Sequence, residues 1–397
     1  MTIAIPDLGF GPFGGYRVLS RLATEWTREG HDVTFYVPAS SPRPYHPTEA
    51  KIVWADDEGN SVPAPPHTVG QVRGSARKVR ELASLRRGLH RYAQDADIAF
   101  ASHSFVALAA MSSAIRAKTV FYSQLYEPSL YAEAAGKRRW GHELLCRSAY
   151  LAPIVHVVNS PIYLTYPLTR ANEWVAPGLD PGHFFPDASA RTPAGSPFRI
   201  GTIGRIEPGK GTRYAVDAFR ALRDAGESVE LHVAFGGLDD ETLAEPGVHL
   251  IVPNSDAQLG DFYRSVDAIV AACTYQFGAP HYPVMEALAC GVPVVTTGYL
   301  PADETNAWIV PPHDASAIAQ SLRSIRDDTK AASLKVQHGL ASIAPFSWHA
   351  VADKMMQIFV DAVSRPGLAR RVWSPAASTS QVPRRVAASS IRSDDGG

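Results

Sequence analysis

The segment Gly201-Thr-Ile-Gly-Arg205-Ile-Glu-Pro-Gly-Lys210-Gly211 indicates the fold class, because it joins an apolar strand pattern to a helical one. The strand pattern spans Phe198–Ile203, and apolar residues between Ala215 and Leu222 then recur at helical spacing. The glycines allow backbone N–H groups to approach a ligand, and Arg205 and Lys210 add two cations at a helix N-terminus. This unit predicts a parallel α/β sheet and a site for an anion of phosphate or diphosphate character.

Strand and helix patterns alternate on both sides of this unit. Strand patterns span Thr2–Pro6, Val33–Val37, Ile98–Ala101, Thr119–Tyr122, Ile154–Val158, Val229–Phe235, Val248–Val252, Ala268–Cys273 and Val292–Thr296. Helical patterns lie near 19–26, 74–94, 104–115, 138–150, 161–168, 259–266, 284–290 and 314–327. Such alternation predicts an α/β fold of two Rossmann-like, doubly wound parallel-sheet domains. We expect the functional cleft between them, at the C-terminal ends of both sheets.

Proline and glycine crowd together between residues 177 and 197, which indicates a domain boundary. From Arg365 onward the chain is rich in Ser, Pro, Ala and Arg, which is typical of a disordered tail. We therefore expect an N-terminal domain (1–180), a linker (181–197), a C-terminal domain (198–346), a helix packed back on the N-terminal domain (347–364) and a tail (365–397).

Charge, cysteine content and hydropathy exclude several functional classes. The 397 residues carry 38 Lys and Arg against 39 Asp and Glu, a net charge of −1, so no overall field attracts nucleic acid. The three cysteines, at 146, 273 and 290, lie in apolar segments and predict neither a disulfide framework nor a zinc site. No signal peptide or transmembrane segment is apparent, which leaves only peripheral membrane association open. We expect a cytoplasmic protein.

The glycine-rich segment also matches part of a P-loop. Gly204-x-x-x-x-Gly209-Lys210 fits that motif, but Gly211 replaces the Ser or Thr that would hold magnesium. The other alternative is an ordinary turn that binds no ligand. The acidic pair Asp95-Ala-Asp97 favours a helix-ending turn over a metal site. No metal and no cofactor are expected.

A second cluster surrounds Glu286 in Pro280-His-Tyr-Pro-Val-Met-Glu286-Ala-Leu-Ala-Cys-Gly291. A carboxylate in such an apolar helix is costly to bury without a partner. As a hydrogen-bond acceptor it suits a vicinal diol, such as the ribose hydroxyls of a nucleotide. The alternative is that Glu286 faces solvent or caps its own helix.

Taken in order, these motifs resemble GT-B glycosyltransferases of glycosyltransferase family 4. The resemblance covers about residues 1–363 and includes Gly14-Gly15, Gly30-His-Asp-Val33, Val158-Asn-Ser160, Ala176-Pro-Gly-Leu-Asp180, Gly204-Arg205, Lys210-Gly211, Leu259-x-x-Phe-Tyr-Arg-Ser-x-Asp267, Glu286-Ala-Leu-Ala-Cys-Gly-Val-Pro-Val-Val295 and Ile309-Val-Pro-Pro-x-Asp314. It implies a nucleotide-sugar donor in the C-terminal domain, bound through Gly204 and Gly209. Arg205 and Lys210 would hold the diphosphate and Glu286 the ribose, as the catalytic set of a retaining, metal-independent transferase. The acceptor would lie mainly on the N-terminal domain, near Gly14 and Gly15.

The sequence departs from the family pattern at two places. Gly278 stands where a second glutamate is usual, near the donor sugar, and the histidine expected after Thr119–Tyr122 is missing. Both departures resemble WsaF-like bacterial rhamnosyltransferases, which makes rhamnose our leading candidate. The same resemblance implies that Tyr282 and His281 lie near the donor and that Gln124 and Glu127 position sugar or acceptor hydroxyls. His103, which follows the strand pattern Ile98–Ala101, is a further cleft candidate. Alternatively, His281 and Tyr282 only pack their loop, and His103 is structural.

The expected activity is transfer of a hexose or deoxyhexose from a nucleoside diphosphate to an acceptor hydroxyl, in the biosynthesis of a glycan, a glycolipid or a natural product. Two other functions fit the same architecture. One is a nucleotide-sugar epimerase of the UDP-GlcNAc 2-epimerase type. The other is a degenerate, non-catalytic homologue that activates a partner glycosyltransferase, which the missing glutamate encourages.

Overall fold

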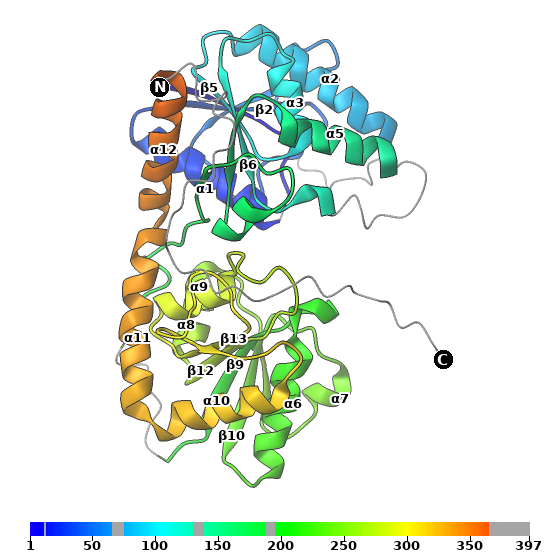
Figure 1. Cartoon of the computed structure of the whole chain (residues 1–397). Coiled ribbons are helices and arrows are strands. Elements are labelled where there is room, and N and C mark those ends of the chain that lie inside the picture. The colour runs from blue at the N-terminus through cyan, green and yellow to red at the C-terminus, as the bar shows by residue number, and fades with distance from the viewer. Residues whose placement is uncertain (12, 66–74, 130–138, 188–194, 365–397) are drawn as a thin grey trace.

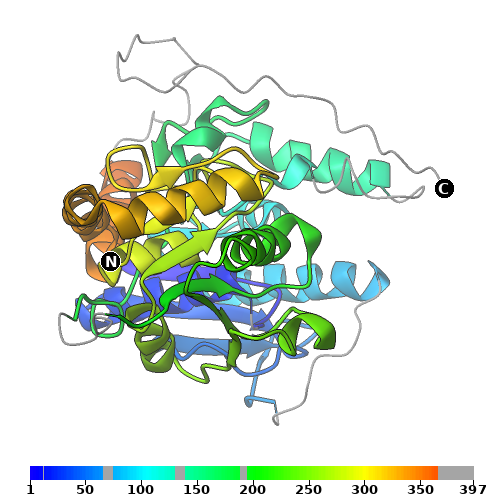
Figure 2. The same cartoon turned by 90° about the horizontal axis from the view of Figure 1, so that it is seen from below.

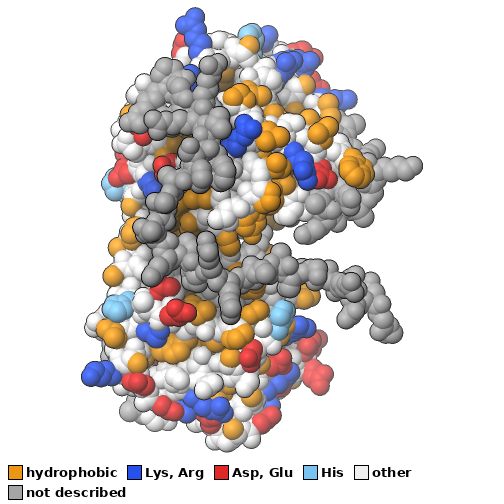
Figure 3. Space-filling view, viewed as in Figure 1, with side chains coloured by type: hydrophobic (Ala, Val, Ile, Leu, Met, Phe, Trp, Pro, Cys, Tyr) orange, Lys and Arg blue, Asp and Glu red, His pale blue; other side chains and the backbone are white. Residues whose placement is uncertain are grey.

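The computed structural model describes residues 1–11, 13–65, 75–129, 139–187 and 195–364. It contains two α/β domains, one above the other in Figure 1, each built on its own sheet. The surface is hollowed where the two domains meet (Figure 3). The prediction of two parallel-sheet domains is therefore confirmed.

The N-terminal domain contains an eight-stranded sheet in the order β4-β3-β2-β1-β5-β6-β7-β8. Its strands are β1 (Thr2–Pro6), β2 (Asp32–Pro38), β3 (Lys51–Ala55), β4 (Ser61–Val62), β5 (Ile98–Ala101), β6 (Lys118–Ser123), β7 (Val155–Val158) and β8 (Glu173–Trp174). Its helices are α1 (Gly14–Arg28), α2 (Ser75–Tyr92), α3 (Ser104–Met111), α5 (Arg139–Leu151) and the 3-10 helix η1 (Pro161–Thr165). All neighbouring strands are parallel except β3 and β4. The strand order reverses at β1, so ligands are expected at the C-terminal ends of β1 and β5.

The C-terminal domain contains a six-stranded, all-parallel sheet in the order β11-β10-β9-β12-β13-β14. Its strands are β9 (Phe198–Ile203), β10 (Val229–Ala234), β11 (Val248–Ile251), β12 (Ala268–Ala271), β13 (Val294–Thr296) and β14 (Trp308–Ile309). Its helices are η3 (Pro208–Lys210), α6 (Thr212–Asp224), α7 (Asp240–Leu243), α8 (Asp256–Arg264), α9 (Tyr282–Ala289), α10 (Ala315–Asp327) and α11 (Thr329–Ile343). Apolar side chains of α8 and α9 pack on one face, and those of α6 and α10 on the other, so the sheet is covered on both sides (Figure 2).

Several elements differ from the sequence expectations, including the short strands β4, β8 and β14 and the short helix α7, for which no pattern was found. Strand β3 was not predicted, because its residues are mostly half-buried and it begins with an exposed lysine. Helix α11 was not predicted either, since only Ala332, Gly339 and Ile343 of its residues are buried and its apolar periodicity is weak. The helix expected at 161–168 is the shorter η1, because Tyr166 precedes a proline and adopts extended geometry.

The chain crosses back to the N-terminal domain through its last described helix. The 3-10 helix η4 (Ala344–Phe346) connects α11 to α12 (Trp348–Ser364), which packs beside α1 (Figure 1). The indole N–H of Trp26 donates to the carbonyl of Ala352 at 3.2 Å, and the Phe359 ring lies 5.1 Å from that of Trp26. A Cβ on Gly178 would lie 2.6 Å from the Trp348 ring, so only glycine lets the two crossing segments meet.

Between the domains, the first part of the expected linker packs against the C-terminal domain. Phe184 is buried in the C-terminal core, and Arg264 of α8 donates to the carbonyl of His183 at 3.0 Å. Residues 188–194 and the tail 365–397 lie outside the described residues.

Among the described helices, none is both long and apolar enough to cross a bilayer. The three cysteines are free and buried.

Replacing Phe359 by alanine is expected to lower the free energy of unfolding by about 3–5 kcal/mol, because Phe359 is fully buried against Trp26 and Phe100. Val360→Ala is the matched control, since the Val360 side chain is 41% exposed on the same helix. Urea unfolding followed by circular dichroism measures both variants. Equal losses in the two would contradict the packing of α12 against α1.

Candidate active site

The glycine-rich turn connects the C-terminal end of β9 to the start of α6. Gly211 has φ of +76°, and a Cβ there would lie 1.9 Å from the carbonyl oxygen of Ala272. A Cβ on Gly204 would lie 1.6 Å from the carbonyl oxygen of Gly236. Both positions therefore require glycine. The turn is closed by Thr212, whose hydroxyl accepts from the Arg205 N–H at 2.9 Å and donates to the Arg205 carbonyl at 3.1 Å.

The two predicted cations lie on this turn. Lys210 is half-buried, with its ammonium 5.0 Å from the centre of the Tyr275 ring, and Arg205 is exposed. Arg205 also lines a cavity beside the turn, together with Arg213 and Thr212. Two cations beside the N-terminus of α6 form a suitable site for a diphosphate.

Glu286 lies on α9 at the junction of the two domains. It is only 3% exposed, so it does not face solvent. Its Oε2 accepts a hydrogen bond of 2.8 Å from the Tyr263 hydroxyl, and its Oε1 lies 3.8 Å from the Arg17 guanidinium. Burial raises the pKa of Glu286 to about 7, although Arg17 and the Tyr263 hydrogen bond act in the opposite direction.

Arg17 connects the two domains at this point. From α1 it donates to the Asp256 carboxylate at 2.9 Å, and its guanidinium lies 5.0 Å from the centre of the Tyr282 ring. One turn further along α1, Arg21 lies 3.9 Å from the same Asp256 carboxylate. Arg17, Asp256 and Tyr263 were not predicted from the sequence. The available signal was weak: two arginines four residues apart on one face of a predicted helix.

His281 and Tyr282 lie close to Glu286 in the chain, at the start of α9. The His281 ring packs 4.8 Å from that of Tyr299. Burial, together with the charges of Lys210 and Arg205, lowers the pKa of His281 to about 3, so this imidazole is neutral at physiological pH. Among the described atoms, His281 Nδ1 and the Tyr282 hydroxyl are buried without a hydrogen-bond partner. Buried polar atoms of this kind are expected to face a ligand or water.

Gly278 occupies the position where the family resemblance expects a glutamate. Its φ is +81°, and a Cβ there would lie 3.2 Å from the Ile162 side chain. Its carbonyl accepts a hydrogen bond of 2.6 Å from the Ser160 hydroxyl of the N-terminal domain. The backbone itself fills this position, and a glutamate side chain would be strained there.

On the N-terminal side, Gly14 lies close to Tyr282, and Gln124 contacts the neighbouring Gly15. The Gln124 amide donates to the Gly15 carbonyl at 3.1 Å, and a Cβ on Gly14 would lie 3.8 Å from the Tyr282 ring. Gly14, a predicted acceptor residue, therefore adjoins the predicted donor residue Tyr282 across the domain junction.

His103 and Glu127 form a separate pair at the start of α3. His103 Nε2 lies 3.4 Å from the buried Glu127 carboxylate, which also accepts from the Ser104 N–H at 2.9 Å and from the Ser104 hydroxyl at 2.6 Å. His103 Nδ1 caps α3 by accepting from the Phe105 N–H at 3.3 Å. Both residues thus have a structural role at the start of this helix.

The acidic pair Asp95 and Asp97 is remote from this site. Asp97 accepts a hydrogen bond of 2.8 Å from the Thr2 N–H, which attaches the segment before β5 to β1. Neither aspartate belongs to a group that could hold a metal ion among the described residues.

The raised pKa of Glu286 predicts how stability depends on pH. Between pH 4.5 and about 7, Glu286 stays protonated in the folded protein but is ionised in the unfolded chain. This stabilisation is complete at low pH and is lost as the pH rises through that range. In Glu286→Gln the side chain is neutral at every pH, so this variant lacks the titration. Between roughly pH 5 and pH 8, the free energy of unfolding of the unaltered protein should therefore fall by about 2 kcal/mol more than that of Glu286→Gln.

Urea unfolding of both proteins across this pH range measures the difference. Glu304→Gln is the control, because Glu304 is exposed and should show no such divergence. Parallel curves for the unaltered protein and Glu286→Gln would rule out the proposed titration.

Comparison with known proteins agrees with this architecture. Residues 197–328 match the family model described as glycosyl transferases group 1. D-inositol 3-phosphate glycosyltransferase of Corynebacterium glutamicum is 26% identical over 218 residues, which cover 48% of this chain and 51% of that protein. The chain thus spans about half the length of such curated relatives.

Solved structures match nearly the whole chain. Sucrose-phosphate synthase from Thermosynechococcus elongatus has a TM-score of 0.71 at 16% identity, over 92% of this chain and 99% of that one. Anabaena HepE in complex with UDP-glucose has a TM-score of 0.64 at 14% identity, over 91% and 100%. Membership of family 4 and the relation to WsaF-like rhamnosyltransferases stay predictions. The chain has the GT-B fold, and its residues 197–328 match glycosyl transferases group 1.

Proposed function

We propose that this protein is a glycosyltransferase that moves a hexose or deoxyhexose from a nucleoside diphosphate to an acceptor hydroxyl. The observation that carries the proposal is the placement of two cations, Arg205 and Lys210, on a turn that requires glycine at positions 204 and 211, near the buried carboxylate of Glu286. The match of residues 197–328 to glycosyl transferases group 1 supports the same activity. HepE, a protein of the same fold, binds UDP-glucose.

The donor would lie along the C-terminal domain. Backbone N–H groups at the start of α6, next to the turn that contains Gly204 and Gly209, would bind the diphosphate together with Arg205 and Lys210. Glu286 Oε2 already accepts from Tyr263, whereas Oε1 lies 3.8 Å from Arg17, beyond hydrogen-bond distance. Oε1 is therefore suited to accept from the ribose hydroxyls.

The transferred sugar would lie near His281, Tyr282 and Gly278. His281 Nδ1 and the Tyr282 hydroxyl offer buried polar atoms for sugar hydroxyls. Because Gly278 brings no carboxylate to this side, the sugar pocket is less polar than the family pattern implies, which favours a deoxyhexose such as rhamnose. The relation to WsaF-like rhamnosyltransferases is part of this proposal.

The chemical step would proceed with retention and without a protein nucleophile. The bond from the anomeric carbon to the leaving phosphate breaks, the acceptor oxygen bonds to the same carbon on the same face, and the acceptor proton passes to the departing phosphate. Arg205 and Lys210 would stabilise the negative charge that develops on the leaving diphosphate. The neutral His281 places no third positive charge beside them. This step requires neither a metal nor a cofactor.

The acceptor would bind to the N-terminal domain at Gly14, which adjoins Tyr282, and at the neighbouring Gly15 and Gln124. His103 and Glu127 would act less directly, by holding the start of α3. The acceptor belongs to a glycan, a glycolipid or a natural product, and fold alone does not distinguish these classes.

Lys210→Ala and Arg205→Ala should each lower the rate of sugar transfer by about 10²–10³-fold, because each removes a fixed cation from the developing charge. A screen of nucleoside diphosphate sugars by thermal shift identifies the donor first, since a bound donor stabilises the folded state. Transfer is then measured by release of the nucleoside diphosphate in the presence of candidate acceptors.

Lys51→Ala is the control, because Lys51 is an exposed lysine paired with Asp32 on a remote strand and should leave the rate unchanged. Transfer that survives both site substitutions would remove the donor-site assignment. Incubation with donor alone separates the epimerase alternative, which would yield an isomerised sugar. The absence of binding to any nucleoside diphosphate would favour the non-catalytic alternative.

A further inference from the structure

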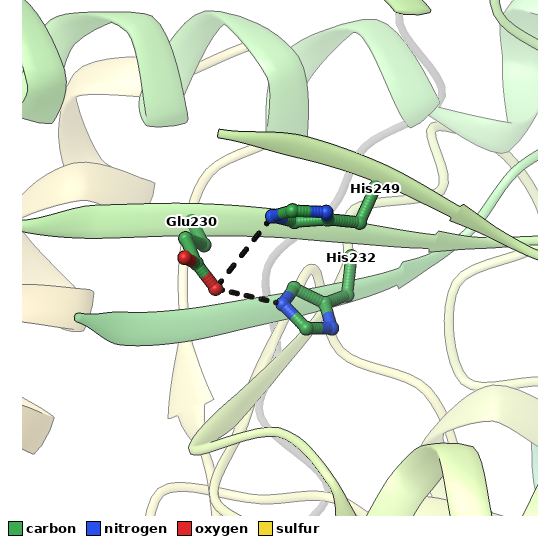
Figure 4. Close-up of side chains that lie close together, drawn as sticks. All are labelled: Glu230, His232 and His249. Carbon is green, nitrogen blue, oxygen red and sulfur yellow. Dashed lines mark hydrogen bonds and ion pairs between the residues drawn. The ribbon is translucent and has the colours of Figure 1, made fainter. Parts of the chain in front are cut away.

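Two histidines and a glutamate gather on one face of the C-terminal sheet, away from the candidate active site. Glu230 and His232 are alternate residues of β10, so their side chains point to the same face. His249 of β11 pairs directly with His232 in the parallel register, which brings the third side chain beside the other two (Figure 4).

The three side chains converge on a common point. Glu230 Oε2 lies 3.2 Å from His232 Nε2 and 3.7 Å from His249 Nε2, and the donor atoms of all three residues lie within 4.8 Å of one another. Bonds of about 2.0–2.1 Å to a tetrahedral Zn²⁺ set neighbouring donor atoms about 3.3 Å apart. The observed separations need only small side-chain movements to reach this geometry.

The donor set selects the class of cation. Two imidazoles and one carboxylate suit Zn²⁺ and similar divalent transition metals, whereas Mg²⁺ and Ca²⁺ prefer oxygen ligands. The side chains of His232, Glu230 and His249 are 17%, 31% and 49% exposed, so the cation can enter from solvent and keep water as a fourth ligand. Nearby, the Arg199 side chain lies 3.4 Å from the Asp267 carboxylate, which offsets its positive charge.

We propose that Glu230, His232 and His249 form a binding site for a divalent transition cation of the Zn²⁺ class, which fastens β11 to β10. Strand β11 is the edge of the sheet and has no further strand on its other side among the described residues. A cation shared by the two strands would oppose fraying of this edge. Glu230 pairs with Arg199 near the start of β9, whereas the glycine-rich turn follows the end of β9, so the cation site is separate from the proposed donor site.

A second group of possible ligands provides a comparison within the same chain. Glu29, His349 and Asp353 also lie close together, but they offer one imidazole, and the His349 side chain is 70% exposed. Paired strands do not fix the positions of these three residues. We therefore expect the tighter binding at Glu230, His232 and His249.

The test is titration of the full chain, stripped with a chelator, with Zn²⁺ in a calorimeter. We expect one tightly bound Zn²⁺ per chain and a higher unfolding temperature in its presence. His249→Asn and Glu230→Gln should each weaken Zn²⁺ binding at least tenfold, as loss of even an outer-shell partner does so by about 10–100-fold. His349→Asn is the matched control and should bind Zn²⁺ as the unaltered chain does.

His249 is the main target because it is half-exposed on an edge strand, so its loss should leave the fold intact without metal. Equal unfolding temperatures of the metal-free proteins check this point. The proposal is overturned if the unaltered chain binds no Zn²⁺, if all variants bind it equally, if His349→Asn alone loses binding, or if Mg²⁺ competes on equal terms. The donor plays no part in this measurement, so its outcome is independent of the proposed transferase activity.

Discussion

The buried carboxylate of Glu286 is the constraint on which the junction of the two domains depends. A carboxylate with so little exposure is costly unless it is hydrogen-bonded and partly neutralised. Its compensation comes from both sides of the junction: the Tyr263 hydroxyl from the C-terminal domain and the Arg17 guanidinium from the N-terminal domain. The ionisation of Glu286 and the relative position of the domains are therefore coupled. A donor that binds Glu286 would alter both.

The neighbouring glycine-rich turn works by the close approach of backbone segments. Gly204 and Gly211 pass so near the carbonyls of Gly236 and Ala272 that no side chain fits. Arg205 and Lys210 are thereby held on a rigid turn, and their fields reach His281. The charges that a leaving diphosphate would need are thus in place before any ligand binds, which is the meaning of electrostatic preorganisation.

The sequence predicts the parts of this arrangement that are local. Phe198–Ile203 and Ile98–Ala101 are largely apolar runs, and the structure has strands with these same bounds. Arg205, Lys210 and Glu286 could be singled out because each lies in a motif of a few residues. Arg17 and Asp256 could not, since they are 239 residues apart and meet only after the domains dock. Strand β3 was missed because half-buried residues carry little apolar signal.

The return of α12 to the N-terminal domain has a consequence for how the chain folds during synthesis. Trp26, Phe100 and Phe359 form one aromatic cluster, although residues 348–364 are made after the entire C-terminal domain. A nascent N-terminal domain on the ribosome therefore lacks one wall of its core and exposes the surface that α12 later covers. The core of the N-terminal domain is therefore completed only when the last helix emerges, after the C-terminal domain has already been made.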